Sequence, residues 1–295
     1  MWPLVLPFAS STWIRPLERL GTVAIVGVGL IGGSVGLTLR ARGLASRVIG
    51  VGRDPVRLAE AVRIGAIDSA ETDLGRAVEE ADVAVVCTPV GRIADDCRSA
   101  AKLGSDHLLV TDAGSTKAGI VTAIESDPVA RSKFAGAHPI AGSERSGVAA
   151  ASSDLFEGRP CVLTPTAETP PDRLRRAAEF WSALGCHIVE MSPEEHDQVL
   201  ARTSHLPHAV ASALAGCVRE SWWNLAGGAF RDGTRVAASD ASLWSDIFLA
   251  NRVPLLDAID EFDRRLGACR AALLARDPDA LVAWWNDRRL DAFAE

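Results

Sequence analysis

A glycine-rich turn directly after an apolar strand pattern is the feature that most constrains the fold of this chain. The stretch Val23–Ser34 reads Val-Ala-Ile-Val-Gly-Val-Gly-Leu-Ile-Gly-Gly-Ser, and an apolar helical pattern follows it through Leu39. A strand, a Gly-x-Gly-x-x-Gly turn and a helix in this order predict a dinucleotide-binding site. Gly27 permits the tight turn, Gly29 lets the backbone approach a pyrophosphate, and Gly32 lets the helix pack closely on the strand.

The helix after this turn adds electrostatic attraction for a phosphate. Its first N–H groups have no partners within the helix, and its N-terminus carries about half a positive charge. We therefore expect cofactor contacts from Leu30 and Ile31, which open the helix, in addition to the glycines.

Similar apolar stretches recur along the first two-thirds of the chain, and helical patterns separate them. They lack polar alternation, which is typical of parallel strands covered on both faces. The further predicted strands are Arg47–Gly52, Asp82–Thr88, His107–Asp112, Phe134–Pro139, Cys161–Pro165 and His187–Ser192. The expected fold class is therefore α/β, with an N-terminal Rossmann-type, doubly wound, mostly parallel sheet.

The pattern changes near residue 192. Ser192-Pro-Glu-Glu combines an N-cap serine, a proline at N1 and a glutamate at N3, which indicates the start of a helix. Alanine and leucine then recur at helical spacing, with interruptions at Pro207, which should kink a helix, and at Gly227-Gly228. Amphipathic patterns follow over residues 254–275 and 280–293. We expect an all-helical C-terminal domain.

These patterns divide the chain into an extension over residues 1–20, a dinucleotide-binding domain over 21–192 and a helical domain over 193–295. The extension is apolar, but it contains three prolines and lacks a basic start, so we expect a poorly ordered segment rather than a targeting signal. A helical domain of about a hundred residues is marginally stable alone. We therefore expect it to pack against its neighbour or against a second copy of itself.

Charge and cysteine content restrict the partners and the compartment. The 295 residues carry a formal net charge of −7, which argues against nucleic acid and anionic membranes as partners. An anionic substrate would then need a local basic pocket, so individual arginines are informative. The six cysteines are scattered without a Cys-x-x-Cys pair, which indicates reduced thiols in a cytoplasmic protein. We predict no membrane-spanning segment.

The end of the second predicted strand bears on the choice of cofactor. NAD-binding folds place an acidic residue there to hold the ribose hydroxyls, but this chain has Gly52, followed by Arg53 and Asp54. If Gly52 takes the acidic position, Arg53 can pair with the 2′-phosphate of NADP. Alternatively, Asp54 reaches back to the ribose, or it only caps a helix ahead of Pro55. We expect NADP or NAD, with NADP slightly favoured.

Polar side chains also follow other predicted strands. Thr88 with Pro89, Ser115 and His138 lie at the carboxyl ends of strands, where parallel α/β sheets bind ligands. A hydroxyl and an imidazole there can hold and deprotonate an alcohol, since an unperturbed histidine has a pKa of about 6.5. The alternatives are that Ser115 caps a helix and that His138, before Pro139, is a structural loop residue.

The helical domain adds two histidines and two arginines. His205 and His208 are three residues apart and can share a helix face, either as metal ligands or as donors to an anion. Because the carboxylates expected of a metal site are absent nearby, we predict no metal. Arg231, Asp232 and Arg235 form either a surface ion pair or an arginine fork aimed at a carboxylate.

Taken together, the motifs resemble those of the prephenate/arogenate dehydrogenase family of tyrosine biosynthesis. The resemblance covers roughly residues 22–265 and rests on five motifs in series: Gly27–Gly33, Asp112–Lys117, Gly136–Gly147, Ser204–His208 and Phe230–Arg235. It implies a nucleotide domain followed by a helical domain that binds substrate and forms a homodimer. The implied reaction is the NAD(P)-dependent oxidative decarboxylation of prephenate to 4-hydroxyphenylpyruvate, or of arogenate to tyrosine.

The resemblance also implies roles for individual residues. His138 would accept the proton of the ring hydroxyl, Ser115 would orient that hydroxyl and the nicotinamide, and Arg235 would bind a substrate carboxylate. Further residues of the substrate pocket would be His205, His208, Ser143, Asp232 and Trp244. Gly52 departs from the acidic residue common in NAD-using members of the family.

Two other functions remain open from the sequence. One is a dehydrogenase of small β-hydroxy acids, which shares the opening fold but uses a catalytic lysine on the first helix of its helical domain, where this chain has none. The other is a dinucleotide-binding sensor without catalysis, which would bind the cofactor without turnover.

Overall fold

The structure is a computed structural model that describes residues 19–143 and 145–287; most of the predicted extension lies outside these ranges. The strands are β1 (Leu20–Val26), β2 (Ala45–Val51), β3 (Ser69–Glu71), β4 (Val83–Val86), β5 (Leu109–Asp112), β6 (Phe134–Ala135), β7 (Ala137–Pro139), β8 (Pro160–Leu163) and β9 (His187–Glu190). The first helices are α1 (Leu30–Ala41), α2 (Pro55–Arg63), α3 (Leu74–Val78), α4 (Val90–Leu103), α5 (Ala118–Glu125), α6 (Pro128–Lys133) and α7 (Pro171–Ala183). The later helices are α8 (Pro193–Leu200), α9 (Leu206–Gly216), α10 (Gly228–Thr234), α11 (Ala241–Ala250), α12 (Arg252–Ala275) and α13 (Pro278–Asn286).

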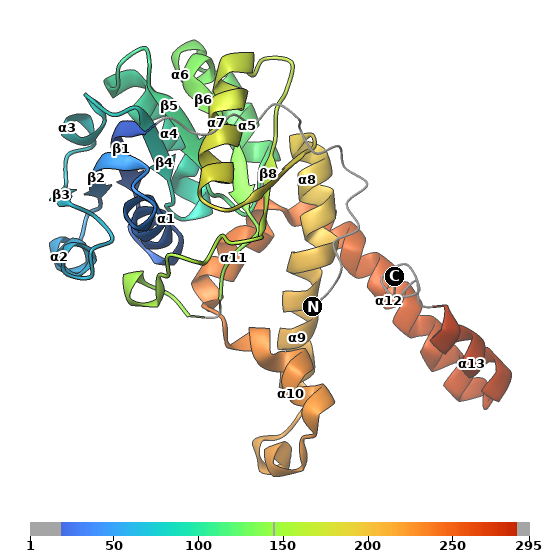
Figure 1. Cartoon of the computed structure of the whole chain (residues 1–295). Coiled ribbons are helices and arrows are strands. Elements are labelled where there is room, and N and C mark those ends of the chain that lie inside the picture. The colour runs from blue at the N-terminus through green and yellow to red at the C-terminus, as the bar shows by residue number, and fades with distance from the viewer. Residues whose placement is uncertain (1–18, 144, 288–295) are drawn as a thin grey trace.

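Six parallel strands form the main sheet, in the order β3-β2-β1-β4-β5-β6. The helices α1 and α7 pack on one face, where the buried Trp181 donates its indole N–H to Thr111. Helices α3 to α6 cover the other face (Figure 1). This confirms the expected doubly wound α/β fold, because continuous apolar strands need cover on both sides.

A second, smaller sheet joins β7, β8 and β9, with β7 antiparallel to β8 and β8 parallel to β9. The predicted strand Phe134–Pro139 is therefore split between two sheets. The break falls at Gly136, where a Cβ atom would lie 2.8 Å from the Thr164 hydroxyl oxygen. The backbone at Ala137 turns away and donates to Asp112, which leaves His138 in the middle of β7.

The helical part begins at α8, which two residues separate from β9, so the boundary proposed at residue 192 falls in this short link. Ser192 accepts a hydrogen bond from the backbone N–H of Glu195, as an N-cap serine should. A π-helical turn over Ala201–His205 connects α8 to α9, and Pro207 lies in the first turn of α9. The interruption predicted at Pro207 thus takes the form of a widened turn, because proline has no N–H to continue the regular hydrogen-bond pattern.

The last helices extend away from the sheets (Figure 1). The predicted patterns over 254–275 and 280–293 correspond to α12 and α13, and the end of the second pattern lies outside the described residues. Within the described parts of the chain, no helix is long and apolar enough to cross a membrane.

Candidate active site

The glycine-rich turn between β1 and α1 has the shape that a dinucleotide requires. Gly27 has a φ of +92°, and a Cβ atom there would lie 2.8 Å from the carbonyl oxygen of Cys87. A Cβ atom on Gly32 would lie 2.2 Å from the carbonyl oxygen of Gly27, so only glycine allows this approach of helix to strand. Around Gly29, by contrast, no atom beyond its two chain neighbours lies within 4 Å of the Cβ position, so a pyrophosphate has room to approach the turn.

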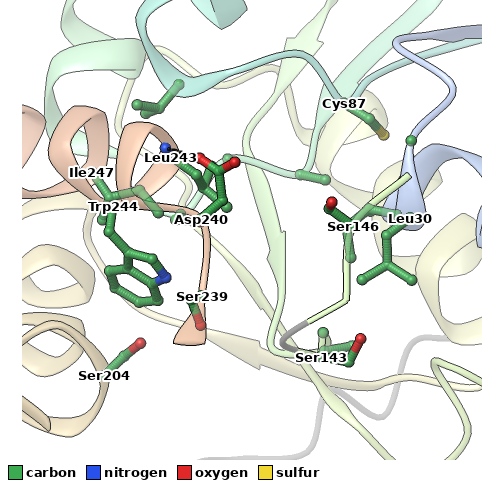
Figure 2. Close-up of a pocket in the computed structure, with 18 of the residues that line it drawn as sticks. Leu30, Cys87, Ser143, Ser146, Ser204, Ser239, Asp240, Leu243, Trp244 and Ile247 are labelled. Carbon is green, nitrogen blue, oxygen red and sulfur yellow. Dashed lines mark hydrogen bonds between the residues drawn. The ribbon is translucent and has the colours of Figure 1, made fainter. Parts of the chain in front are cut away.

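A cavity of about 720 Å³ opens beside this turn and extends to the helical part of the chain. Figure 2 shows Leu30, Cys87 and Ser146 on one side of it and Leu243, Trp244 and Ile247, from α11, on the other. The cavity lies at the carboxyl ends of the strands, as expected for a parallel sheet. Its predicted site residues are Gly29, Leu30, Ile31, Thr88, Pro89, Ser115, His138, Ser143, His208, Arg235 and Trp244.

Six predicted site residues do not line this cavity. Gly27 and Gly32 do not reach the cavity surface, but their lack of a Cβ atom allows the close packing at the turn. Arg53 and Asp54 lie at the start of α2, beyond the end of β2. His205 is buried behind the cavity wall and Asp232 lies on α10.

His138 is buried and backed by a second histidine. Its Nδ1 atom lies 2.8 Å from Nε2 of His196, whose Nδ1 atom lies 2.8 Å from a carboxylate oxygen of Asp197. Burial, first of all, lowers the pKa of His138 well below its usual value, and the nearby His196, Lys117 and His205 lower it further. His138 is therefore neutral at pH 7, which is the form that can accept a proton.

A buried ion pair supports the loop that carries Ser115. Lys117 and Asp112 are both fully buried and form a salt bridge, and the Lys117 ammonium also donates to the carbonyl oxygen of Ala137. Asp112 accepts from the backbone N–H groups of Gly114 and Ala137. The alternative role of Ser115 as a helix cap is wrong, because Lys117 occupies the N-cap position of α5.

The histidines of the helical part have different surroundings. His208 stacks on Trp244, with ring centroids 3.5 Å apart, and its Nδ1–H donates to the carbonyl oxygen of Ser204. His205 lies 3.0 Å from the amide nitrogen of Asn251, and burial lowers its pKa to about 4. Among the described residues, no group of histidine, cysteine and carboxylate side chains could hold a metal ion.

The cavity is more basic than the chain as a whole. Among the described residues that line it, three are arginines, Arg145, Arg159 and Arg235, and one, Asp240, is acidic. The Asp240 carboxylate accepts from the backbone N–H of Leu243 and caps α11. A chain of net charge −7 thus has a local surplus of cations at this cavity, which suits an anionic ligand.

Sequence reasoning did not single out His196, Asp197, Arg145 or Arg159. A histidine next to an aspartate on a predicted helix is typical of a solvated helix face, and a sequence separation of 58 positions between His138 and His196 gives no sign of contact. The net negative charge of the chain was the signal that could have directed attention to the further arginines, because an anionic ligand would need local cations.

Two family models match most of the chain. The family model of the prephenate dehydrogenase nucleotide-binding domain matches residues 35–190, and that of the prephenate dehydrogenase dimerization domain matches residues 192–287. The chain belongs to the prephenate dehydrogenase family. Members of this family therefore provide the relevant comparison for its sheets, its helices and the cavity between them.

Individual members of the prephenate dehydrogenase family are similar along most of the chain. It is 36% identical to a prephenate dehydrogenase of Bacillus subtilis (strain 168), over 90% of this chain and 73% of the relative. The crystal structure of prephenate dehydrogenase from A. aeolicus, in complex with hydroxyphenyl propionate and NAD+, has a TM-score of 0.85 at 33% identity and covers 92% of this chain and 97% of its own. The structure of Synechocystis arogenate dehydrogenase has a TM-score of 0.75 at 30% identity, and the match covers 92% of this chain and 98% of the other.

Proposed function

We propose that this chain catalyses the oxidative decarboxylation of prephenate or arogenate, with hydride transfer to NAD(P)+, in tyrosine biosynthesis. The observation that carries the proposal is that His138, the glycine-rich turn at Gly29 and Arg235 line the same cavity in a chain of this family. The open space at Gly29 and the α1 N-terminus fit the pyrophosphate of the cofactor. Bound NAD(P)+ supplies the acceptor for the hydride.

Each residue of the cavity has its own proposed role in the reaction. His138, neutral and facing the cavity, removes the proton of the substrate's ring hydroxyl, and Ser115 orients that hydroxyl. Arg235 binds a substrate carboxylate, with His208 and Trp244 beside it and Ser143 on the opposite loop. Loss of the ring carboxylate as CO₂ then gives an aromatic ring, so the protein mainly supplies position, a base and cations.

We also propose a preference for NADP. Gly52 leaves no carboxylate at the end of β2, and the Asp54 carboxylate accepts from the backbone N–H groups of Val56 and Arg57 as the cap of α2. This engagement of Asp54 supports the interpretation that Arg53 reaches the 2′-phosphate, and it weakens the alternative that Asp54 holds the ribose.

Two further proposals concern assembly and compartment. The second family model is that of a dimerization domain, and large apolar side chains are exposed on the helices that it matches, including Leu256, Leu266 and Leu274 of α12. We therefore propose a homodimer formed through the helical part. All six cysteines are free thiols, which supports a reducing, cytoplasmic compartment.

The test is a spectrophotometric assay of cofactor reduction with prephenate and with arogenate, each with NAD+ and NADP+. We expect turnover with at least one substrate and a higher kcat/KM with NADP+ than with NAD+. Absence of turnover in all four combinations would contradict the enzymatic proposal, and a higher kcat/KM with NAD+ would contradict the role of Arg53.

A further inference from the structure

Behind His138, a chain of hydrogen bonds crosses from the nucleotide-binding part into the helical part. His138 lies on β7, whereas His196 and Asp197 lie on α8. The distances are 2.8 Å from His138 Nδ1 to His196 Nε2 and 2.8 Å from His196 Nδ1 to Asp197 Oδ1. His196 is fully buried and Asp197 nearly so, which excludes water as a competing partner.

Asp197, at the far end of this series of hydrogen bonds, determines which atom is the donor in each of them. The Asp197 carboxylate also accepts from the backbone N–H groups of Lys117 and Ala118, at 2.7 and 3.0 Å, at the N-terminus of α5. Each oxygen of this carboxylate thus accepts from a backbone donor, and a carboxylate can only accept. The Nδ1 atom of His196 must therefore carry the hydrogen.

This assignment determines the tautomer of both histidines. A neutral imidazole has one donor nitrogen and one acceptor nitrogen, so Nε2 of His196 is an acceptor. Nδ1 of His138 must then be the donor in the contact between the rings. The remaining nitrogen of His138, Nε2, keeps its lone pair, and it belongs to the side chain that lines the cavity.

We propose that His196, anchored by Asp197, is a positioning residue that holds His138 in its Nδ1–H tautomer with Nε2 ready to accept the substrate proton. This deepens the proposed function and rests on its assignment of His138 as the base. The proton moves from the hydroxyl oxygen of the substrate to Nε2, and His138 becomes an imidazolium that donates from Nδ1 to His196. Without that acceptor, the other tautomer would place N–H toward the hydroxyl and could not act as a base.

The charges around His138 give the acceptor a second effect. The fully buried Lys117 ammonium and the imidazole of His205 also act on His138 and disfavour its protonated form. His196 is itself kept neutral by burial, although Asp197 opposes that effect. His196 therefore has two effects: its neutral Nε2 atom fixes the tautomer of His138, and together with Lys117 and His205 it keeps His138 unprotonated until the substrate proton is transferred.

Two substitutions of His196 separate its hydrogen bond from its volume. His196→Gln keeps an acceptor oxygen near the place of Nε2, whereas His196→Met fills a similar volume without an acceptor. Partners that orient a functional imidazole are worth about 10- to 100-fold in activity, so we expect His196→Met to slow single-turnover hydride transfer by that factor. We expect His196→Gln to restore the rate to within about threefold of the wild type. The KM values for substrate and cofactor should change little in both variants, and the exposed His187→Gln is the matched control.

Equal rates for His196→Met and the wild type would overturn the proposal, as would equal slowing by both substitutions. Nitrogen NMR of the histidine-labelled wild-type protein provides a measurement that needs no substitution at His196. We expect the His138 resonances, identified by their loss in His138→Asn, to report a protonated Nδ1; a protonated Nε2 would overturn the proposal. Full turnover by His138→Asn would instead refute the proposed base, whatever tautomer is found.

Discussion

Three buried histidines determine how the stability of the folded chain depends on pH. His138, His196 and His205 all have their pKa lowered, and burial is the main cause for each. For His205 the pKa falls from the ordinary 6.5 to about 4. Because the unfolded chain then binds protons that the folded chain cannot, acid must destabilise the fold.

The pH dependence follows from the sign of this shift. Above pH 6.5 His205 is neutral in both states, so its contribution is fully present; stability is lost as the pH falls from about 6.5 toward about 4. Between pH 7 and pH 5 the free energy of unfolding should fall by about 2 kcal/mol from this group alone. Denaturant titrations of the wild type and of His205→Asn, whose amide oxygen can still accept from Asn251, should show a smaller fall for the variant. Identical pH dependence in both proteins would contradict this prediction.

The role of a residue could be predicted where a sequence motif determines it, but not where it depends only on tertiary packing. Gly27 and Gly32 could be interpreted because the strand-turn-helix order dictates the backbone shape, and the structure has that shape. Asp54 could be predicted as a cap from its place before Pro55. The contact of His138 with His196 depends on how two domains pack, and no local spacing encodes it.

At the scale of elements, the split between β6 and β7 depends on a buried ion pair. Asp112 ends β5 and receives the N–H of Ala137, while Lys117 donates to the carbonyl oxygen of the same residue. The two side chains therefore hold both polar backbone groups of the residue at which the chain leaves the main sheet. An uncompensated charge at this fully buried place would be costly.

Lys117→Met tests this dependence, because it leaves the Asp112 carboxylate buried without its cation. We expect a loss of about 3–5 kcal/mol in the free energy of unfolding, measured by denaturant titration. The control is Lys102→Met, which removes a largely exposed lysine paired with Asp127, and its unfolding midpoint should hardly change. Equal effects of the two substitutions would show that the buried pair has no special role at the split.

The prediction of elements from sequence succeeded for long apolar stretches and failed where tertiary contacts determine which strands form and which sheet they join. Strands β1, β2, β4 and β5 each contain a run of buried apolar residues and were predicted. The three-residue strand β3, Ser69–Glu71, has no apolar run to identify it. The transfer of β7 to the second sheet depends on Gly136 and on the ion pair, both of which act through partners distant in sequence.

For the molecule as a whole, the exposed apolar side chains of the helical part allow a test of the proposed homodimer. Leu274 of α12 is 72% exposed, and Leu103, at the end of α4 in the nucleotide-binding part, is 53% exposed. If the helical part forms the homodimer, Leu274→Arg should shift the protein toward monomer, whereas Leu103→Arg should leave it dimeric. Sedimentation or light scattering at micromolar concentration measures the mass; a monomeric wild type would contradict the proposed dimer.

The place of Asp197 in the molecule limits how its two parts can be separated or exchanged. This carboxylate belongs to α8, yet it completes the first turn of α5 in the other part of the chain. A nucleotide-binding unit cut out or grafted onto a foreign helical partner would retain its glycine-rich turn, but it would lose the cap of one helix and the support behind His138, the proposed base. The two parts are thus not interchangeable modules. The nucleotide-binding part has its α5 cap and the hydrogen-bond partner of His138 only when its own helical part is docked.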